Sequence, residues 1–233
     1  MKLALCVVGC GEFAGIFAKA MAPLRSEVDL YFASRDAQKA QSYARKFDGL
    51  DAFGSYRAAA ADPRIGAMYL CTPHHLHMEH SLIAARAGKH ILVEKPMALN
   101  IQQAEEMVAA ADKNGVKLIA GHTQSFSPHI RLMRQIVNSG RIGKLGAINA
   151  IAYTDWMIRP RTWEELAPDQ GGGIVYRQTP HQIDSIRSIG GGLIRNIRGA
   201  AGQWMDTRPI PGYYAVFMEF ESGVPAVAIH NGY

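Results

Sequence analysis

The sequence VVGCGEFAG, residues 7–15, decides the fold that we expect for this chain. It follows an apolar run and leads into a segment with helical spacing, so its glycines lie between a strand and a helix. Gly9 permits a tight turn and Gly11 lets the backbone approach a pyrophosphate, while the small Ala14 lets the helix pack on the strand. This G-x-G-x-x-A pattern predicts a dinucleotide-binding turn.

Short apolar runs alternate with segments of helical period from the N-terminus to about residue 123. This alternation is typical of βαβ units that form a parallel sheet with helices on both faces. The expected strands are residues 3–8, 28–34, 51–53, 67–71, 90–93 and 117–121. The expected helices are residues 13–22, 37–47, 78–87 and 102–113. We therefore predict an α/β fold with a doubly wound Rossmann domain over residues 1–123.

The pattern beyond this domain changes, and residues 124–233 read as an α+β domain. The expected helices are residues 128–139 and a second one that ends near residue 189. The expected strands are residues 147–154, 193–201, 213–221 and 224–229, the last two joined at Ser222-Gly223. The chain stops directly after a strand, without a helix or a polar tail to cover the sheet edge. We therefore expect a fragment in which the second domain is incomplete.

Composition excludes several classes of protein. Hydrophobic residues make up 48% and charged residues 19% of the chain, as in ordinary globular proteins. Without a secretory leader or a run of about 18 apolar residues, we expect a cytoplasmic protein that does not contact membranes. The net charge of +5 is dispersed, which argues against nucleic acid and suits a small anionic ligand. The three cysteines lack C-x-x-C spacing and are expected to be buried free thiols.

The stretch FASRD, residues 32–36, lies where a dinucleotide fold recognises the adenosine ribose. An acid at the strand end would accept a hydrogen bond from the 2′-hydroxyl group, but this sequence has Ser34 there. The next residue, Arg35, can pair with a 2′-phosphate, which favours NADP over NAD. The alternative is that Asp36 begins the next helix as its N-cap and Arg35 is solvated, which leaves NAD open.

The stretch YLCTPHHLHMEH contains four histidines that could suggest a metal site. Only His77 and His80 have a spacing that shares a helix face, and no H-E-x-x-H motif is present. We therefore expect no metal. The histidines are instead predicted to cap the helix and to line a cleft beside Cys71, Thr72 and Pro73.

The motif VEKP places Lys95 directly after the predicted fifth strand of the sheet. Ligands bind doubly wound sheets at this carboxyl edge. Pro96 stiffens the backbone and Glu94 could hold the ammonium group, so we expect Lys95 in a cleft; the alternative is an ordinary surface lysine. Beside a cationic nicotinamide the pKa of Lys95 should fall, which suits a proton carrier.

These motifs are followed in order by GHTQSFSP, SGRIGKLG and GGGIVYRQTPHQID. Together they resemble the glucose-fructose oxidoreductase and inositol dehydrogenase (Gfo/Idh/MocA) family over nearly the whole chain. The resemblance implies a second domain with a large, open, mostly antiparallel sheet that forms a homo-oligomer, a dimer or a tetramer. It also implies that Lys95 lies near the nicotinamide with His181 opposite as a general acid or base, and that Asp184 supports the helix of His181.

The residues expected to bind the cofactor lie in the glycine turn and at the strand ends. They are Gly9, Gly11, Glu12, Phe13, Ala14, Ser34, Arg35, Cys71, Thr72, Pro73, His77, Glu94 and Lys95.

Arg177 is a departure from the family, because much of the family carries an aspartate four residues before the histidine. Either Lys95 and His181 transfer the proton alone, or Arg177 marks a site for an anionic substrate. The loop before the glycines adds two more arginines, and this region resembles the phthalate 4,5-cis-dihydrodiol dehydrogenase branch. Arginine binds carboxylates through paired hydrogen bonds. The expected substrate-binding residues are Arg159, Arg161, Arg177 and Asp184.

An alternative is that these arginines pair with Glu164, Glu165 and Asp169 at a surface. The main hypothesis is an NAD(P)-dependent dehydrogenase that acts on a small, carboxylated cyclic diol, with Lys95 and His181 as proton carriers. A sugar or polyol dehydrogenase of the same family, an enzyme of redox-assisted hydrolysis, and a dinucleotide-sensing protein without turnover remain open.

Overall fold

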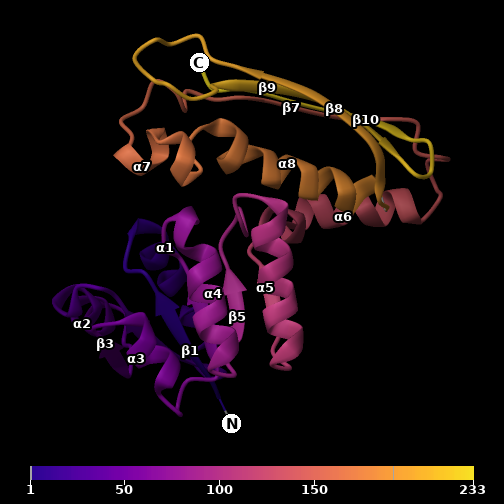
Figure 1. Cartoon of the computed structure of the whole chain (residues 1–233). Helices are drawn as coiled ribbons and strands as arrows, with labels where there is room; N and C mark the ends of the chain where they lie inside the picture. Colours follow the sequence, from indigo (N-terminus) through magenta and orange to yellow (C-terminus); the bar gives the residue numbers. More distant parts are fainter. Residues whose placement is uncertain (1, 191) are drawn as a thin grey trace. The chain divides into compact units, whose positions relative to one another are not determined.

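The computed structural model describes residues 2–190 and 192–233 of the chain (Figure 1). The chain divides into two compact units, Met1–Gly121 and His122–Tyr233.

The first unit is built on a six-stranded sheet in the order β3-β2-β1-β4-β5-β6. All of its neighbouring strands pair in parallel. The strands are β1 (Leu3–Val8), β2 (Val28–Ala33), β3 (Asp51–Phe53), β4 (Ala67–Leu70), β5 (His90–Val93) and β6 (Leu118–Ala120). The order reverses between β1 and β4, which makes a topological switch point at the carboxyl edge of the sheet. The predicted doubly wound Rossmann sheet is therefore confirmed.

Helices cover both faces of this sheet. They are α1 (Glu12–Ala20), α2 (Ala37–Lys46), α3 (Tyr56–Ala61), α4 (His77–Arg86) and α5 (Ile101–Lys113), with the short 3-10 helices η1 (Ala22–Leu24) and η2 (His74–Leu76). Side chains alternate along β1: Val7 packs with α1 and α2, while Cys6 and Val8 pack with α3, α4 and α5. This alternation has the period of two that a strand imposes.

Several helix ends follow from local sequence. Asp36 caps α2 by accepting from the backbone N–H of Lys39 at 3.0 Å, so the alternative interpretation of this aspartate is correct. The helix predicted over residues 13–22 ends at Ala20, and Pro23 follows in the first turn of η1. Helix α3 was not predicted, although Ser55 caps it in the manner typical of a helix start.

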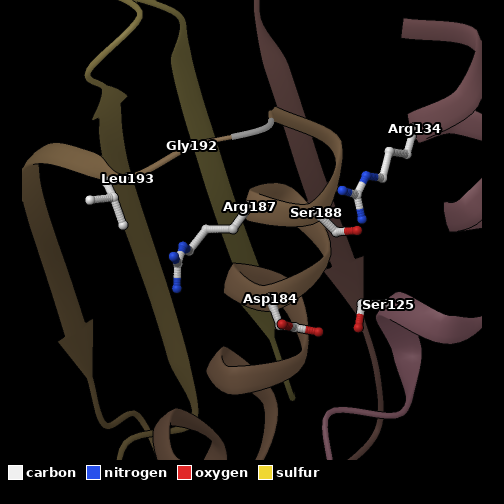
Figure 2. Close-up of a pocket in the computed structure, with 7 residues that line it drawn as sticks. All are labelled: Ser125, Arg134, Asp184, Arg187, Ser188, Gly192 and Leu193. Atoms are coloured by element: carbon white, nitrogen blue, oxygen red, sulfur yellow. The ribbon is translucent and has the colours of Figure 1, made fainter. Parts of the chain in front are cut away.

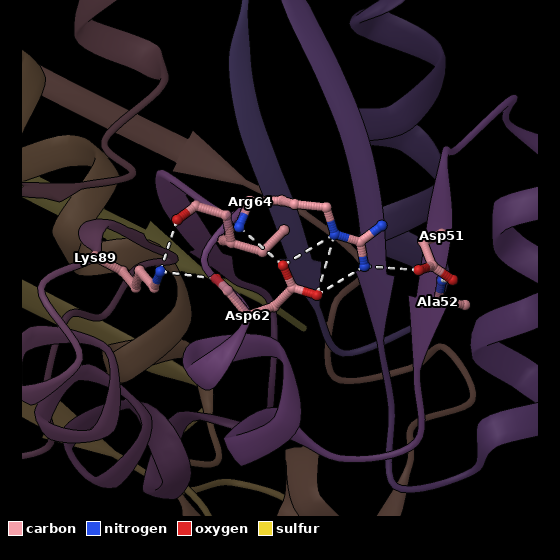
Figure 3. A network of polar contacts seen from close by, with 6 residues as sticks. Asp51, Ala52, Asp62, Arg64 and Lys89 are labelled. Carbon is pink, nitrogen blue, oxygen red and sulfur yellow. Dashed lines mark hydrogen bonds and ion pairs between the residues drawn. The ribbon is translucent and has the colours of Figure 1, made fainter.

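A polar network joins the amino ends of β3, β4 and β5, at the edge opposite the switch point (Figure 3). The Lys89 ammonium donates to the carbonyl oxygens of Asp62 at 2.9 Å and Ile65 at 2.8 Å. Arg64 pairs with Asp62 at 2.7 Å and with Asp51 at 2.8 Å, which lowers the pKa of Asp62 to about 2. These bonds fix the loops from which the strands start.

The second unit contains a four-stranded sheet in the order β7-β10-β9-β8. Its elements are η3 (Gln124–Phe126), α6 (Pro128–Asn138), β7 (Ile148–Tyr153), α7 (Trp163–Leu166), η4 (Pro168–Gln170), α8 (Ile174–Gly190), β8 (Ile194–Gly202), β9 (Tyr213–Phe220) and β10 (Pro225–Asn231). Strand β9 is antiparallel to both of its neighbours, whereas β7 and β10 are parallel. The sheet is mixed and mostly antiparallel, as predicted.

Helix α8 runs along one face of this sheet (Figure 1) and buries Ile174 and Ile186 in a shared apolar core. The other face carries large apolar side chains in the open: Ile151 is 57%, Tyr153 74% and Phe217 48% exposed. No helix in the described ranges is long and apolar enough to cross a membrane.

Candidate functional site

The switch point brings the ends of β1 and β4 into close contact. Gly9 has a φ of +95°, a left-handed conformation that favours glycine. A Cβ atom added to Gly9 would lie 3.0 Å from the carbonyl oxygen of Cys71 and 3.0 Å from Cγ2 of Thr72. Both the backbone conformation and the limited space therefore require glycine at this position. Three of the predicted site residues, Gly9, Cys71 and Thr72, are neighbours.

The start of α1 opens onto free space. Gly11 is the N-cap residue, and no side chain within the described ranges caps the helix there. A Cβ atom added to Gly11 would meet nothing within 4 Å, whereas Ala14 is fully buried against the strand. The Glu12 carboxylate lies in the first turn and the Phe13 side chain is 43% exposed. Backbone N–H groups at such a helix start suit an anion such as a pyrophosphate.

Arg35 lies at a cavity of about 270 Å³ at the end of β2. The cavity is lined by Arg35, Gly54, Ser55, Tyr56, Arg57, Glu79, His80 and Ile83. The Arg57 guanidinium is 3.9 Å from the Glu79 carboxylate, and both side chains are exposed. Ser34 is buried, and its hydroxyl accepts from the N–H of Asp36 at 3.2 Å. The cavity thus offers two guanidinium groups, of which sequence analysis found only one.

His80 links this cavity to the switch point. Its Nδ1 is 3.0 Å from Oγ1 of Thr72, and its ring contacts the Tyr56 ring at a centroid distance of 4.3 Å. Burial lowers the pKa of His80 to about 4, and the positive charge of Arg35 acts in the same direction. His80 is therefore neutral at physiological pH.

His77 is fully buried at the start of α4. Its Nδ1 is 2.9 Å from the carbonyl oxygen of Pro96, and its Nε2 is 2.9 Å from the carbonyl oxygen of Thr72. Burial lowers the pKa of His77, while the two carbonyl groups act in the opposite direction. The ring has no exposed surface and lies between two backbone segments. A role of His77 in binding the cofactor stays a prediction.

Lys95 follows β5 at the same carboxyl edge and is half-buried. The neighbouring Glu94 carboxylate is buried and accepts from the Tyr69 hydroxyl at 2.5 Å and from the backbone N–H of Lys95 at 3.3 Å. Burial raises the pKa of Tyr69, so the phenol keeps its proton and donates it. Sequence analysis missed Tyr69, which stands in an apolar strand and offers no local signal.

In the second unit, His181 and Asp184 lie on α8, three residues apart. Asp184 lies at a cavity of about 550 Å³ (Figure 2). The residues that line it are Ser125, Arg134, Asp184, Arg187, Ser188, Gly192 and Leu193. Oδ2 of Asp184 is buried without a hydrogen-bond partner among the described residues. The cavity is separate from the three arginines that we predicted to bind substrate together with Asp184.

Two of those arginines meet at one carboxylate. Arg161 is 3.5 Å and Arg177 3.2 Å from Oε1 of Glu165, and all three side chains are largely buried. The Arg161 guanidinium also lies over the Trp156 ring, 4.2 Å from its centroid. Arg159 instead pairs with Asp155 at 2.8 Å and is 66% exposed. Glu165 thus pairs with two of the arginines, as the alternative interpretation expected, although this pairing is largely buried and not at a surface.

Among the residues that the structure describes, no three histidine, cysteine, aspartate or glutamate side chains come together as metal ligands. The three thiols are free, and burial raises the pKa of Cys71 and brings that of Cys10 to about 11.

The fold and the switch-point site define a Rossmann-type nucleotide-binding unit followed by a unit with a mixed sheet. The chain belongs to the Gfo/Idh/MocA oxidoreductase family. Residues 3–122 match the family's NAD-binding Rossmann fold, and residues 130–231 match its C-terminal domain.

Two relatives are named as dehydrogenases of cyclic diols. The 1-carboxy-3-chloro-3,4-dihydroxycyclohexa-1,5-diene dehydrogenase of Comamonas testosteroni is 36% identical over 85% of this chain and 50% of its own length. The trans-1,2-dihydrobenzene-1,2-diol dehydrogenase of Sus scrofa is 34% identical over 96% of this chain and 66% of its own. A crystal structure from Bordetella bronchiseptica RB50 has a TM-score of 0.90 and 32% identity, over 100% of this chain and 61% of that one. The chain spans about half the length of several relatives that it matches.

We expect the stability of the protein to fall as the pH drops from about 6.5 to about 4 because of His80. The pKa of His80 is lower in the folded than in the unfolded chain, so the unfolded chain binds the extra proton throughout this interval. The free energy of unfolding should therefore decrease by about 2–3 kcal/mol. Urea unfolding of the His80→Asn variant at several pH values should show a shallower decrease. The exposed His90→Asn serves as the control, and equal slopes for His80→Asn and the wild type would contradict the assignment.

Proposed function

We propose that this chain carries the cofactor site and the proton carriers of an NAD(P)-dependent dehydrogenase that acts on a hydroxyl-bearing carbon of a small, carboxylated cyclic diol. The observation that carries the proposal is the carboxyl edge of the first sheet. There, the glycine turn, the open start of α1 and the half-buried Lys95 occur together at the place where ligands bind doubly wound sheets.

The residues of the glycine turn fit a dinucleotide. Gly9 allows the ends of two strands to approach, and Gly11 leaves room for a pyrophosphate against the first N–H groups of α1. A bound nicotinamide supplies the hydride acceptor. The chain holds the cofactor, excludes water and takes the hydroxyl proton. We propose that the amine of Lys95 accepts this proton and that His181 is the second proton carrier.

We propose NADP as the preferred dinucleotide, with NAD as the alternative. Two guanidinium groups, of Arg35 and Arg57, and the hydroxyl group of Ser55 line one cavity at the end of β2. No carboxylate follows the strand directly, because Ser34 occupies that position and Asp36 caps α2. Such a cavity suits a 2′-phosphate better than a 2′-hydroxyl group.

An anionic substrate is supported by the charge of the second unit. Arg161 and Arg177 lie together at the carboxylate of Glu165 in a largely buried place. We propose that these guanidinium groups attract a substrate carboxylate, to which Arg159 can add. One relative is named as a dehydrogenase of a carboxylated cyclohexadiene diol, and oxidation of such a ring leads toward an aromatic product.

We further propose that the open sheet face with Ile151 and Phe217 joins copies of the protein.

Replacement of Lys95 by Met tests the proton carrier. We expect kcat to fall about 100-fold to 10,000-fold, while dinucleotide affinity changes little, because the variant keeps the side-chain length and loses only the amine. Hydride transfer should be followed with saturating NADP⁺ or NAD⁺ on a panel of carboxylated and uncharged dihydrodiols and polyols. The exposed Lys117→Met is the control. Unchanged turnover would overturn the proposal, and binding of NADPH without turnover of any alcohol by the wild type would indicate a sensing protein.

Replacement of Arg35 by Ala tests the cofactor preference. We expect NADPH affinity to fall about 10-fold to 100-fold, with NADH affinity nearly unchanged, because a charge-assisted hydrogen bond contributes about 1.5–3 kcal/mol. Arg57→Ala should show the same selectivity, and the exposed Arg45→Ala should show none. Fluorescence titration with both dinucleotides measures the effect. Equal losses for NADPH and NADH would refute a 2′-phosphate site.

Replacement of Arg177 by Gln tests the substrate charge. We expect KM for a carboxylated dihydrodiol to rise about 10-fold to 100-fold, and KM for an uncharged dihydrodiol to change little. The exposed Arg198→Gln on β8 is the control. If both substrates lose equally, Arg177 has a structural role and the anionic substrate is not supported.

A further inference from the structure

The imidazole of His77 joins two loops at the carboxyl edge of the first sheet. Strands β4 and β5 are parallel neighbours, and the N–H of Glu94 donates to the carbonyl oxygen of Leu70 at 3.0 Å, at the carboxyl ends of both strands. Just beyond this bond, the His77 ring lies between the carbonyl oxygens of Thr72 and Pro96, 2.9 Å from each. The ring therefore extends the connection between the segments that follow β4 and β5 past the end of the sheet.

The direction of these hydrogen bonds is set by chemistry. A carbonyl oxygen only accepts, so each nitrogen of the His77 ring bonds to its oxygen only when that nitrogen carries hydrogen. The ring is fully buried and cannot exchange either partner for water. A neutral ring carries hydrogen on one nitrogen and donates to one of the two oxygens, either through Nδ1 to Pro96 or through Nε2 to Thr72; only a protonated ring donates to both.

Lys95 lies between two anchored residues. On one side, the Glu94 carboxylate accepts a hydrogen bond from the Tyr69 hydroxyl at 2.5 Å. On the other side, the carbonyl oxygen of Pro96 lies 2.9 Å from Nδ1 of His77. A lysine side chain has several rotatable bonds, so the place of its amine depends on how well its backbone is held.

We propose that His77 carries its hydrogen on Nδ1 and is a positioning residue for Lys95: by donating to the carbonyl oxygen of Pro96 it holds the Lys95-Pro96 backbone, and so places the amine for proton transfer. The inference rests on the proposed function of Lys95. It assigns to His77 no contact with cofactor or substrate.

Two amide variants separate the two sides of the ring. Asn places its amide nitrogen near the position of Nδ1, so His77→Asn can still donate to Pro96. Gln is longer and places its amide nitrogen near the position of Nε2, so His77→Gln can donate to Thr72 but not to Pro96. Each variant keeps one hydrogen bond and a polar side chain, so both should lose similar stability, which thermal unfolding checks.

Hydrogen exchange of the chain without cofactor measures the effect independently of activity. In His77→Gln we expect exchange of the amides in residues 94–99 to rise about 10-fold or more, and in His77→Asn to stay within about threefold of the wild type. With NADP⁺ and a dihydrodiol that the wild type oxidises, kcat should fall about 10-fold to 100-fold in His77→Gln and largely recover in His77→Asn. KM for the dinucleotide should stay nearly constant in both.

The results distinguish this inference from the proposed function. If the two variants show the same exchange in residues 94–99, or if His77→Gln is the better protected one, the positioning role is overturned. The positioning role is also overturned if amide exchange differs between the two variants but kcat falls equally in both. If Lys95→Met retains full turnover, the proposed function fails, whereas the exchange difference between the His77 variants still reports whether the ring holds the segment.

Discussion

The close approach of β1 and β4 is the constraint on which the first unit depends. Gly9 leaves no room for a Cβ atom beside Cys71 and Thr72, and its left-handed backbone turns the chain toward α1. Because the strands are parallel, the same approach brings the ends of β2 and β5 to the same edge. The glycine turn, the Arg35 cavity and Lys95 become one region through this packing.

Buried polar groups hold that region, and most of them bond to the backbone. The His77 ring lies between two carbonyl oxygens, and Glu94 accepts from a phenol and from a backbone N–H. Such groups are costly to bury without partners, so each of these bonds resists displacement of its loop. Rigid loops suit chemistry in which a proton carrier must stay in place.

In the second unit, Gly172 and the Glu165 carboxylate determine the conformation and the ion pairs of the segment that precedes α8. A Cβ atom on Gly172 would lie 2.6 Å from the carbonyl oxygen of Ala167, so the loop closes tightly only with glycine. Glu165 then gathers Arg161 and Arg177, and its other oxygen accepts from the N–H of Thr162 at 3.0 Å. The carboxylate thus sets the charge near the start of the helix that carries His181.

The sequence by itself determined the order of the strands and of the longer helices, the glycine turn and the place of Lys95, because period, turn residues and caps act over a few neighbouring residues. It missed α3, although the Ser55 cap was visible. Only the tertiary structure showed that His77 is buried between two carbonyl groups and that Glu165 binds two arginines. These partners are distant in the sequence, and a side chain's role depends on which partners packing brings within bonding distance.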